Sequence, residues 1–444
     1  MFGAGSRGVG MSGALTAAAS GGEAAFHNPA MLGGTVTPGA WAGYNGTLNE
    51  LHVDLARPVC TSAYAACRGQ YISGFSARAP QTPRDSQAFM AGWHYPLGGL
   101  FRDRVAIGAA LSLPQGHIIR ISGPDPQTPH FPMYEGMPDR IAFLFGASWR
   151  ITDWWWVGVG TQVLAVLNAQ IDLDLNPTNH TMDKASVRIG LEPRARLTAG
   201  MALHPTPWLW LGASYRQRLS LEYKIPTGID IGSPAHLSIG LGHETLFTPD
   251  ELHLGASWKI LNKRLLISTD LGLAFWSQAP DPSPQVSLRV SGPAADALGL
   301  GPILAVGTDT PAIQLHYSDT LSPAIAFEFH VDENWTLRSG YQYRPTPAQR
   351  ASGPFNYLDN PMQAIGLGGR FGFGSHDAPT QLQLDDDSDR DPAGPAPPLH
   401  VDVGVQLQYL PDRSIYKSDP NDLVGNLTHG GSVWHVGASF GGSF

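Results

Sequence analysis

Long segments of this chain alternate apolar and polar residues with a period of two, and this alternation restricts the fold more than any other feature. In the segment 156–175 one set of alternate positions is almost entirely apolar: Val157, Val159, Val163, Ala165, Leu167, Ala169, Ile171, Leu173 and Leu175. The positions between them include Gln162, Asp172 and Asp174. Because successive side chains of a strand point to opposite faces, the pattern predicts a strand with one apolar and one mainly polar face.

Two further segments, 187–203 and 209–223, repeat the pattern with arginines on the polar face. These strands are longer than the ~5–6 residues usual in globular proteins, whereas a tilted strand that spans a membrane needs about 9–11. In a soluble sandwich the apolar faces of two sheets would pack together, and in a membrane barrel they would face lipid. The strand length favours the barrel.

About 14 such segments can be placed, and an even number is typical of bacterial barrels. They lie near 39–55, 88–97, 104–114, 139–150, 155–175, 186–204, 208–225, 235–260, 264–277, 311–330, 335–345, 361–373, 399–411 and 432–444. We therefore predict an all-β protein whose residues 39–444 form a transmembrane antiparallel β-barrel. Residues 1–38 are rich in Gly and Ala, which let a backbone pack closely inside a barrel, and are predicted to form an N-terminal hatch. A disordered N-terminal tail is the alternative.

Short connections such as 150–154, 204–208, 260–264 and 330–335 alternate with longer loops, as short periplasmic turns and long outer loops do in membrane barrels. The segment 374–398 breaks the rule, since strand parity puts it on the periplasmic side. Its Asp, Pro and Gly content predicts an acidic, flexible insertion. The spacing of its aspartates is not that of an EF-hand loop, so no metal site is predicted.

Composition limits the partners and the compartment. Only 15% of the residues are charged and the formal net charge is −9, so nucleic acid is not an expected partner. The chain has no run of about 18 apolar residues, so no membrane-spanning helix is predicted. An exported protein needs a signal peptide, and none is visible in these residues. Cys60 and Cys67 are the only cysteines and lie close together. A small disulfide loop and two free thiols are both open interpretations.

The residues at the ends of the predicted strands and the last segment of the chain both support an outer-membrane location. Aromatic residues gather near strand ends, as in the interfacial girdles of membrane barrels. The last segment alternates Trp434, Val436, Ala438 and Phe440 on one face and stops at Phe444. It looks like the C-terminal strand that the barrel-assembly machinery recognises.

Several segments, in order, resemble the FadL/TodX family of outer-membrane transporters for long-chain fatty acids and hydrophobic hydrocarbons. The N-terminal GSRGVGMSGALTAAASGGEAAFHNPAML resembles the family's hatch, with Phe26 followed by Asn28, Pro29 and Ala30. PTPWLWLGASYRQRL, LLISTDLGLAFWSQ and DENWTLRSGYQYRPTPAQ resemble later strands and hairpins. The resemblance covers nearly the whole chain and implies a barrel of 14 strands blocked by the hatch.

The resemblance also implies passive uptake by a monomer, without a cofactor, and exit of the ligand sideways through a gap made by a kinked strand. Pro114 and Gly116 end the third predicted strand and are candidates for that kink, because Pro cannot donate to the ladder and Gly weakens it. An ordinary strand end is the alternative. The loop 176–185 is shorter than in the well-known fatty-acid transporters, and 278–311 is the long apolar loop here. The outer docking groove is therefore expected to differ.

Five arginines of the polar faces are the candidate ligand-binding residues: Arg188, Arg194, Arg196, Arg216 and Arg218. Lipid exposure at mid-depth would cost ~2–4 kcal/mol each, so we expect them to face the lumen. One or more would bind a ligand carboxylate, which Arg binds through two parallel hydrogen bonds. An ion-pair network with lumenal acids is the alternative.

Long-chain fatty acids are accordingly the expected ligands of a passive uptake channel in the outer membrane. The alternatives are transport of aromatic hydrocarbons and a barrel without transport, either a receptor or a lipase-like enzyme. An enzyme is not expected, because we find neither a G-x-S-x-G motif nor a convincing Ser–His–acid set.

Overall fold

The computed structural model describes residues 5–56, 80–102, 104–116, 128–134, 141–176, 181–230, 236–280, 285–293, 297, 306–307, 315–348, 356–373, 399–417 and 424–444. Cys60, Cys67 and the acidic insertion 374–398 lie outside these residues. Within them, no helix is long and apolar enough to cross a membrane.

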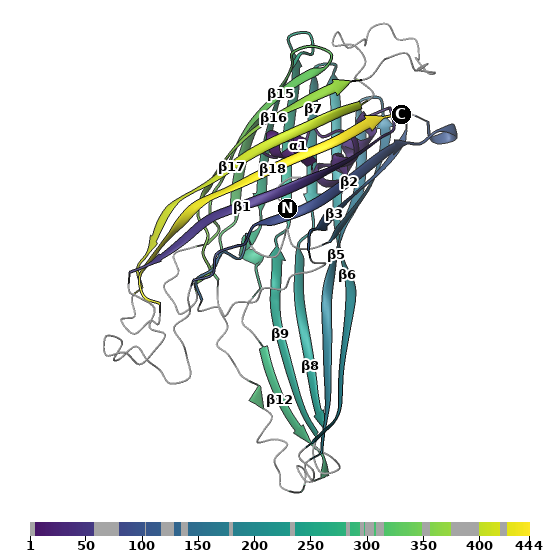
Figure 1. Cartoon of the computed structure of the whole chain (residues 1–444). Coiled ribbons are helices and arrows are strands. Elements are labelled where there is room, and N and C mark those ends of the chain that lie inside the picture. Colours follow the sequence, from purple (N-terminus) through teal and green to yellow (C-terminus); the bar gives the residue numbers. More distant parts are fainter. Residues whose placement is uncertain are drawn as a thin grey trace.

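Fourteen of the described strands close into an antiparallel barrel, as the alternation predicts (Figure 1). They are β1 Gly39–Leu55, β2 Ser86–Pro96, β3 Val105–Pro114, β4 Ala142–Thr152, β5 Trp155–Asn176, β6 Thr181–Thr206, β7 Leu209–Arg216, β10 Glu251–Ile260, β11 Leu265–Ala274, β14 Thr320–His330, β15 Trp335–Arg344, β16 Met362–Phe373, β17 Leu399–Ile415 and β18 Leu427–Ser443. The first and last strands close the ring from the pair Gly39–Ser443 to the pair Leu55–Leu427. Closure leaves no unpaired edge in the bilayer, where backbone groups find no water.

A second group of strands extends the sheet beyond one end of the barrel (Figure 1). It consists of β8 Leu219–Asp230, β9 His236–Thr248, β12 Gln285–Ser291 and β13 Val306–Gly307. This group joins the barrel where β8 pairs with the C-terminal part of β5. The prediction of one strand at 208–225 and one at 235–260 was wrong, because each segment forms two strands. The break before β10 falls at Pro249, which has no N–H to donate to a ladder. The break after β7 lies beside it, where Arg218 N donates to Asp250 Oδ1 at 2.9 Å.

The barrel strands present an apolar face outward. Large apolar side chains are exposed on it in register: Phe143, Phe145, Val159, Leu197, Leu211, Leu254, Leu271, Ile325, Phe327, Leu337, Ile365, Leu367, Val403, Val436 and Phe440. Their strand neighbours are buried, as at Gln162 and Thr198. An apolar outer band with a polar or small-residue interior is the arrangement that a bilayer requires.

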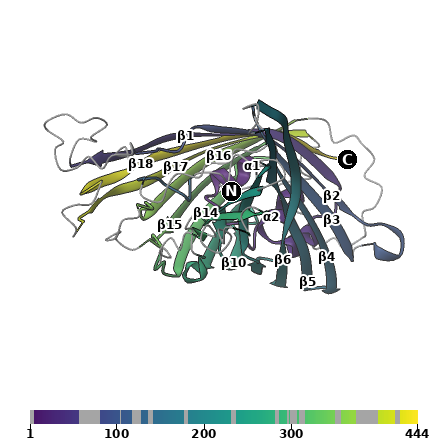
Figure 2. The same cartoon turned by 90° about the horizontal axis from the view of Figure 1, so that it is seen from below.

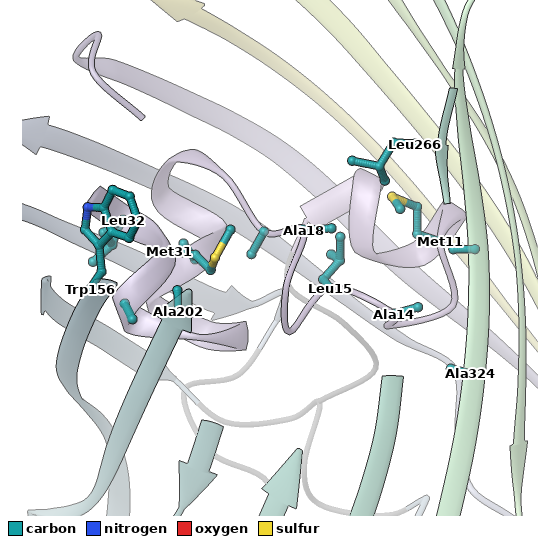
Figure 3. Close-up of a cluster of buried hydrophobic side chains, with 14 of the residues drawn as sticks. Met11, Ala14, Leu15, Ala18, Met31, Leu32, Trp156, Ala202, Leu266 and Ala324 are labelled. Carbon is teal, nitrogen blue, oxygen red and sulfur yellow. The ribbon is translucent and has the colours of Figure 1, made fainter. Parts of the chain in front are cut away.

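The N-terminal residues fill the barrel as the hatch. Figure 2 shows α1 Gly5–Gly10 and α2 Ala24–His27 surrounded by the strands. Two short 3-10 turns, η1 Gly21–Glu23 and η2 Pro29–Gly34, complete it, and two more lie at Gly99–Phe101 and Trp276–Gln278. The main buried apolar cluster joins Met11, Leu15, Met31 and Leu32 of the hatch to wall residues such as Trp156 (Figure 3).

Candidate functional site

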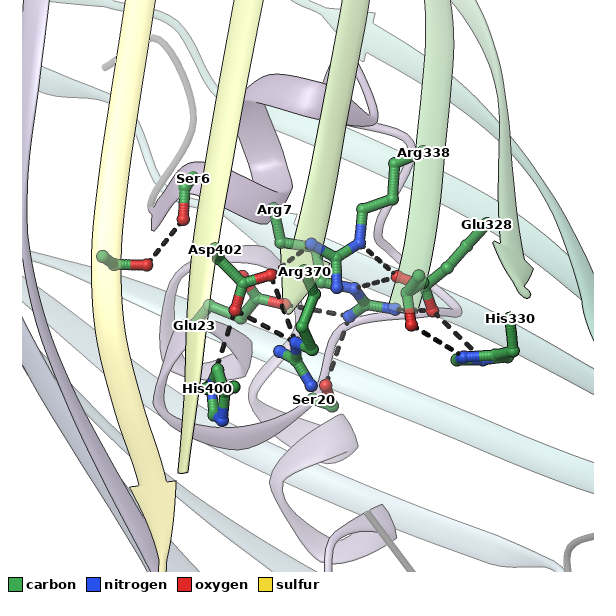
Figure 4. A network of polar contacts seen from close by, with 12 residues as sticks. Ser6, Arg7, Ser20, Glu23, Glu328, His330, Arg338, Arg370, His400 and Asp402 are labelled. Carbon is green, nitrogen blue, oxygen red and sulfur yellow. Dashed lines mark hydrogen bonds and ion pairs between the residues drawn. The ribbon is translucent and has the colours of Figure 1, made fainter. Parts of the chain in front are cut away.

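One arginine of the hatch is held by a buried network of charges (Figure 4). Arg7 Nε and Nη2 donate to the two carboxylate oxygens of Glu328 on β14, at 2.8 and 3.2 Å. Arg7 Nη1 donates to Glu23 at 2.9 Å and to the Ala18 carbonyl at 2.9 Å. The network therefore joins the hatch to the barrel wall and closes a loop within the hatch.

The wall continues the network across three more strands. Arg338 on β15 donates to Glu328 at 2.6 Å and also to Asp402 on β17. Arg370 on β16 donates to Asp402 Oδ2 at 3.0 Å. The three arginines match the three carboxylates in charge, so each buried ion has a partner, without which its burial would be costly.

Burial and pairing shift the ionisation of the hatch groups. Burial alone would lower the pKa of the Arg7 guanidinium, but the carboxylates of Glu328 and Glu23 outweigh it and raise that pKa. Burial raises the pKa of the Glu23 carboxyl, and Arg7 opposes the rise. Arg7 is therefore a permanent cation in the contact between the hatch and the barrel wall.

The predicted hatch residues form the turn at the other end of the hatch. Asn28 Oδ1 accepts from Ala30 N at 3.1 Å, and Pro29 begins η2. Asn28 Nδ2 donates to the Thr16 carbonyl at 2.8 Å and to the Met201 carbonyl of β6 at 3.1 Å. Phe26 packs with the wall residues Met90, Ala110 and Leu144.

Arg216 connects this turn to β7. Its guanidinium lies 4.4 Å from the centre of the Phe26 ring, and Nη2 donates to the Phe26 carbonyl at 2.6 Å. Nη1 makes a 2.8 Å ion pair with Glu251 on β10. Arg216 faces the lumen as expected, and Glu251 already neutralises its charge, so it does not need a ligand carboxylate.

Arg196 on β6 is different, because no acid among the described side chains contacts its buried guanidinium, and Glu251, which pairs with Arg216, acts on it only from a distance. Its side chain is 2% exposed. Nε donates to Gln162 Oε1 at 2.6 Å and Nη1 to Thr248 Oγ1 at 3.1 Å, both neutral partners. No carboxylate of the described residues forms an ion pair with it. A cation buried this way leaves a need for a negative charge.

The other three arginines lie elsewhere. Arg188 and Arg194 are on the part of β6 that β7 does not cover, are 70% and 60% exposed, and face Asp172 and Glu192 at 3.0 and 3.7 Å. Arg218 is exposed at the break between β7 and β8. The structure therefore brings together Arg196 and Arg216, since Thr198 pairs with Arg216 and lies on the same face as Arg196.

The lumen wall has two unlike halves. On β2 to β5 its buried residues are mainly small or apolar: Met90, Ala106, Ala110, Ala142, Leu144 and Leu164. On β11 to β18 buried apolar residues alternate with polar ones, and the buried charges Asp270, Glu328, Arg338 and Asp402 lie on these strands. Arg196 lies at the apolar side, because its partner Gln162 is on β5 beside Leu164. Leu164 in turn packs with Ala142, Leu219 and Leu221.

The proposed kink residues lie at the end of β3. Pro114 is its last residue, and Gly116 follows with φ 83°. The register with β2 runs unbroken from the pair Ala88–Pro114 to the pair Pro96–Ala106. A lateral gap at this place stays a prediction.

Sequence reasoning missed the charged network of Arg7, Glu328, Arg338 and Asp402. The available signal was a charge on the inward face of each of three strands, with one arginine in an N-terminus rich in small residues. Nothing in the spacing shows that these charges meet.

Barrel, hatch and amphipathic wall define an outer-membrane transporter of hydrophobic compounds. The model of the family "Outer membrane protein transport protein (OMPP1/FadL/TodX)" matches residues 3–368, and the chain belongs to this family. A comparison with the sequences of curated proteins gives no match.

Solved structures share the fold. A Pseudomonas aeruginosa FadL homologue is similar with a TM-score of 0.59 and 15% identity, over 99% of this chain and 98% of that one. The toluene transporter TodX of P. putida is similar with a TM-score of 0.54 and 14% identity, over 100% and 99%. The monoaromatic hydrocarbon channel CymD gives 0.54 and 12%, over 100% and 98%.

Proposed function

We propose that this barrel takes up hydrophobic carboxylic acids, with long-chain fatty acids as the substrate, and that Arg196 receives the carboxylate. The observation that carries the proposal is the buried guanidinium of Arg196, whose two hydrogen-bond partners are neutral. A bound carboxylate would supply the missing charge through charge-assisted hydrogen bonds.

The surroundings suit the rest of such a ligand. The cluster of Ala142, Leu164, Leu219 and Leu221 lies beside Gln162 and Thr248, the partners of Arg196. From there Leu144, Ala110 and Met90 continue the apolar wall toward Phe26. An alkyl chain could follow this side of the lumen without losing the environment that it prefers over water.

The test compares a long-chain fatty acid with the fatty alcohol of the same length, using the purified barrel and Arg196→Gln. Loss of hydrogen bonds to a charged group, about 1.5–3 kcal/mol, should weaken fatty-acid binding roughly 10- to 150-fold. Binding of the alcohol should change little. Arg188→Gln, an exposed arginine of the same strand, is the matched control and should behave as the unmodified protein.

Other outcomes assign the ligand differently. If acid and alcohol bind the unmodified protein equally and Arg196→Gln changes neither, the carboxylate proposal is wrong. Saturable binding of toluene in place of both would then support neutral hydrocarbons as the substrate class, with Arg196 serving only to connect β5, β6 and β9.

A further inference from the structure

The turn between β2 and β3 presents two large apolar side chains to the surroundings of the barrel. Leu100 is 96% exposed and Phe101 is 50% exposed. Backbone hydrogen bonds within the turn hold its shape, since Phe101 N donates to the Gly98 carbonyl at 3.3 Å and Arg104 N donates to the Phe101 carbonyl at 3.0 Å. The exposure of Leu100 and Phe101 is therefore built into the turn.

This turn lies outside the ring of strands. In Figure 1 it is at the end of the barrel opposite β8, β9 and β12, and in Figure 2 it projects sideways beyond the strands. Most connections at that end are short, as periplasmic turns are in bacterial barrels. The turn therefore faces the inner leaflet of the outer membrane and not the lumen.

Exposed aromatic side chains of the barrel surface end where the turn begins. Trp93 and Tyr95 of β2 and Trp149 of β4 are all exposed on the lipid-facing surface. Trp149 pairs with Val105, and Leu97 N donates to the Val105 carbonyl at 2.8 Å, so the turn starts beside these aromatic residues. Trp and Tyr mark the interface between the hydrocarbon layer and the lipid headgroups. The turn continues this lipid-facing surface at the depth of the headgroups.

Two cations follow the apolar tip of the turn. Arg102 and Arg104 are both exposed, and with Asp103 between them they give the turn a net charge of +1. A guanidinium binds phosphate oxygens through parallel, charge-assisted hydrogen bonds. An anionic phospholipid thus matches the turn in both parts, because its acyl chains suit the two apolar side chains and its phosphate suits the arginines.

A neighbouring class of turn shows that an exposed apolar residue alone does not create this match. The turn between β14 and β15 also exposes Val331 and Trp335, but it carries Asp332 and Glu333. These carboxylates repel an anionic phosphate. The turn between β10 and β11 repeats the matching combination, with the exposed Leu261 followed by two cations at positions 263 and 264.

We propose that the β2–β3 turn binds anionic phospholipids of the inner leaflet, with Leu100 and Phe101 inserted among the lipids and Arg102 and Arg104 at the phosphates. Such a site holds β2 and β3 at a fixed depth in the membrane. The inference needs no ligand in the lumen, so it stands apart from the proposed uptake of fatty acids.

The depth of the turn is measured with the fluorophore bimane on a single cysteine, in a background where Cys60 and Cys67 are replaced by serine. Leu100→Cys reports on the β2–β3 turn, and Glu333→Cys on the β14–β15 turn is the matched control. Both labelled barrels are placed in phosphatidylcholine vesicles, and their slow migration in cold SDS shows that they are folded.

We expect iodide, present on both sides of the membrane, to quench the label of Glu333→Cys more strongly than that of Leu100→Cys. A nitroxide near the top of the lipid acyl chain should quench in the reverse order. Iodide quenching of the Leu100→Cys label that equals or exceeds that of the control would place the turn in water and overturn the proposal.

The headgroup is tested on the Leu100→Cys barrel with nitroxide lipids that carry either phosphatidylglycerol or phosphatidylcholine. One net positive charge near an anionic lipid should enrich phosphatidylglycerol at the turn about fivefold, so this lipid should quench more. Replacing Arg102 and Arg104 by glutamine should abolish the preference, whereas Arg188→Gln, an exposed arginine of β6, should leave it. Equal quenching by the two lipids, or a preference that survives loss of both arginines, overturns the assignment.

Discussion

Arg7 and Arg188 are the same residue type in opposite environments, and they show how position decides what a charge contributes. Arg7 binds Glu328 and Glu23 with side chains that are 8–10% exposed. Arg188 pairs with Asp172 while 70% exposed. An exposed pair is screened by water and contributes about 0–1 kcal/mol, whereas removing one partner of a buried pair costs roughly 3–5 kcal/mol.

Arg7→Ala should therefore lower the free energy of unfolding by roughly 3–5 kcal/mol, and Arg188→Ala by less than about 1 kcal/mol. Urea unfolding of the barrel in lipid vesicles measures both. The hatch should also loosen, so single-channel conductance should rise in Arg7→Ala only. Equal effects of the two substitutions would mean that the Arg7 contacts do not hold the hatch.

At the scale of the element, the strands that line the hatch carry glycines where the hatch touches them. On β6 a Cβ at Gly200 would collide with Asn28 Oδ1, and on β5 one at Gly158 would collide with the Ala30 backbone. These glycines serve close approach rather than a special backbone conformation. Gly190, on the same strand β6 as Gly200, has nothing within 4 Å of its Cβ position.

The two glycines of β6 give a matched pair of substitutions. Gly200→Ala should destabilise the protein by about 1–3 kcal/mol through overpacking against Asn28 of the hatch, and Gly190→Ala should stay within about 0.5 kcal/mol of zero. Thermal unfolding followed by circular dichroism compares them. A tolerated Gly200→Ala would show that the hatch can shift at Asn28 at little cost.

At the scale of the whole molecule, the lumen separates two tasks. The charged wall of β14 to β17 binds the hatch through Arg7, and the apolar wall of β2 to β5 offers the ligand a path. A barrel that exposed charge all round its lumen would hold the hatch equally well but would repel a hydrophobic ligand.

Charge placed on either wall should therefore have different consequences. Leu144→Glu puts a carboxylate beside Phe26 and Met90, at a cost to an apolar ligand of about 2 kcal/mol or more, and uptake should fall roughly 30-fold. Gln406→Glu, on the charged wall opposite His435, should leave uptake near that of the unmodified protein. Uptake assays in cells with equal amounts of folded barrel compare the two variants. Equal uptake in both would place the path elsewhere.

The sequence by itself determined most of the strands, the lipid-facing side and the hatch. Alternation is a local property, and a segment such as 39–55 shows both its face and its length without reference to the rest of the chain; β1 has those bounds. The inward position of Arg196 and Arg216 followed from the same alternation. The Asn28-Pro29 turn was readable because Asn accepts from the backbone two residues later.

Only the tertiary structure decided which charges are paired. Arg7 and Glu328 are 321 residues apart, and they meet because closure of the ring around the hatch places β14 beside Arg7. Alternation could not show that Arg216 pairs with Glu251 while the hydrogen-bond partners of Arg196 are neutral. The first depends on β10 pairing with β7 across the intervening β8 and β9, and the second on the break at Pro249 that places Thr248 beside Arg196. A period of two fixes the face of each side chain, but register and closure select its neighbours, and the neighbours decide whether an inward arginine holds the hatch or remains open to a ligand.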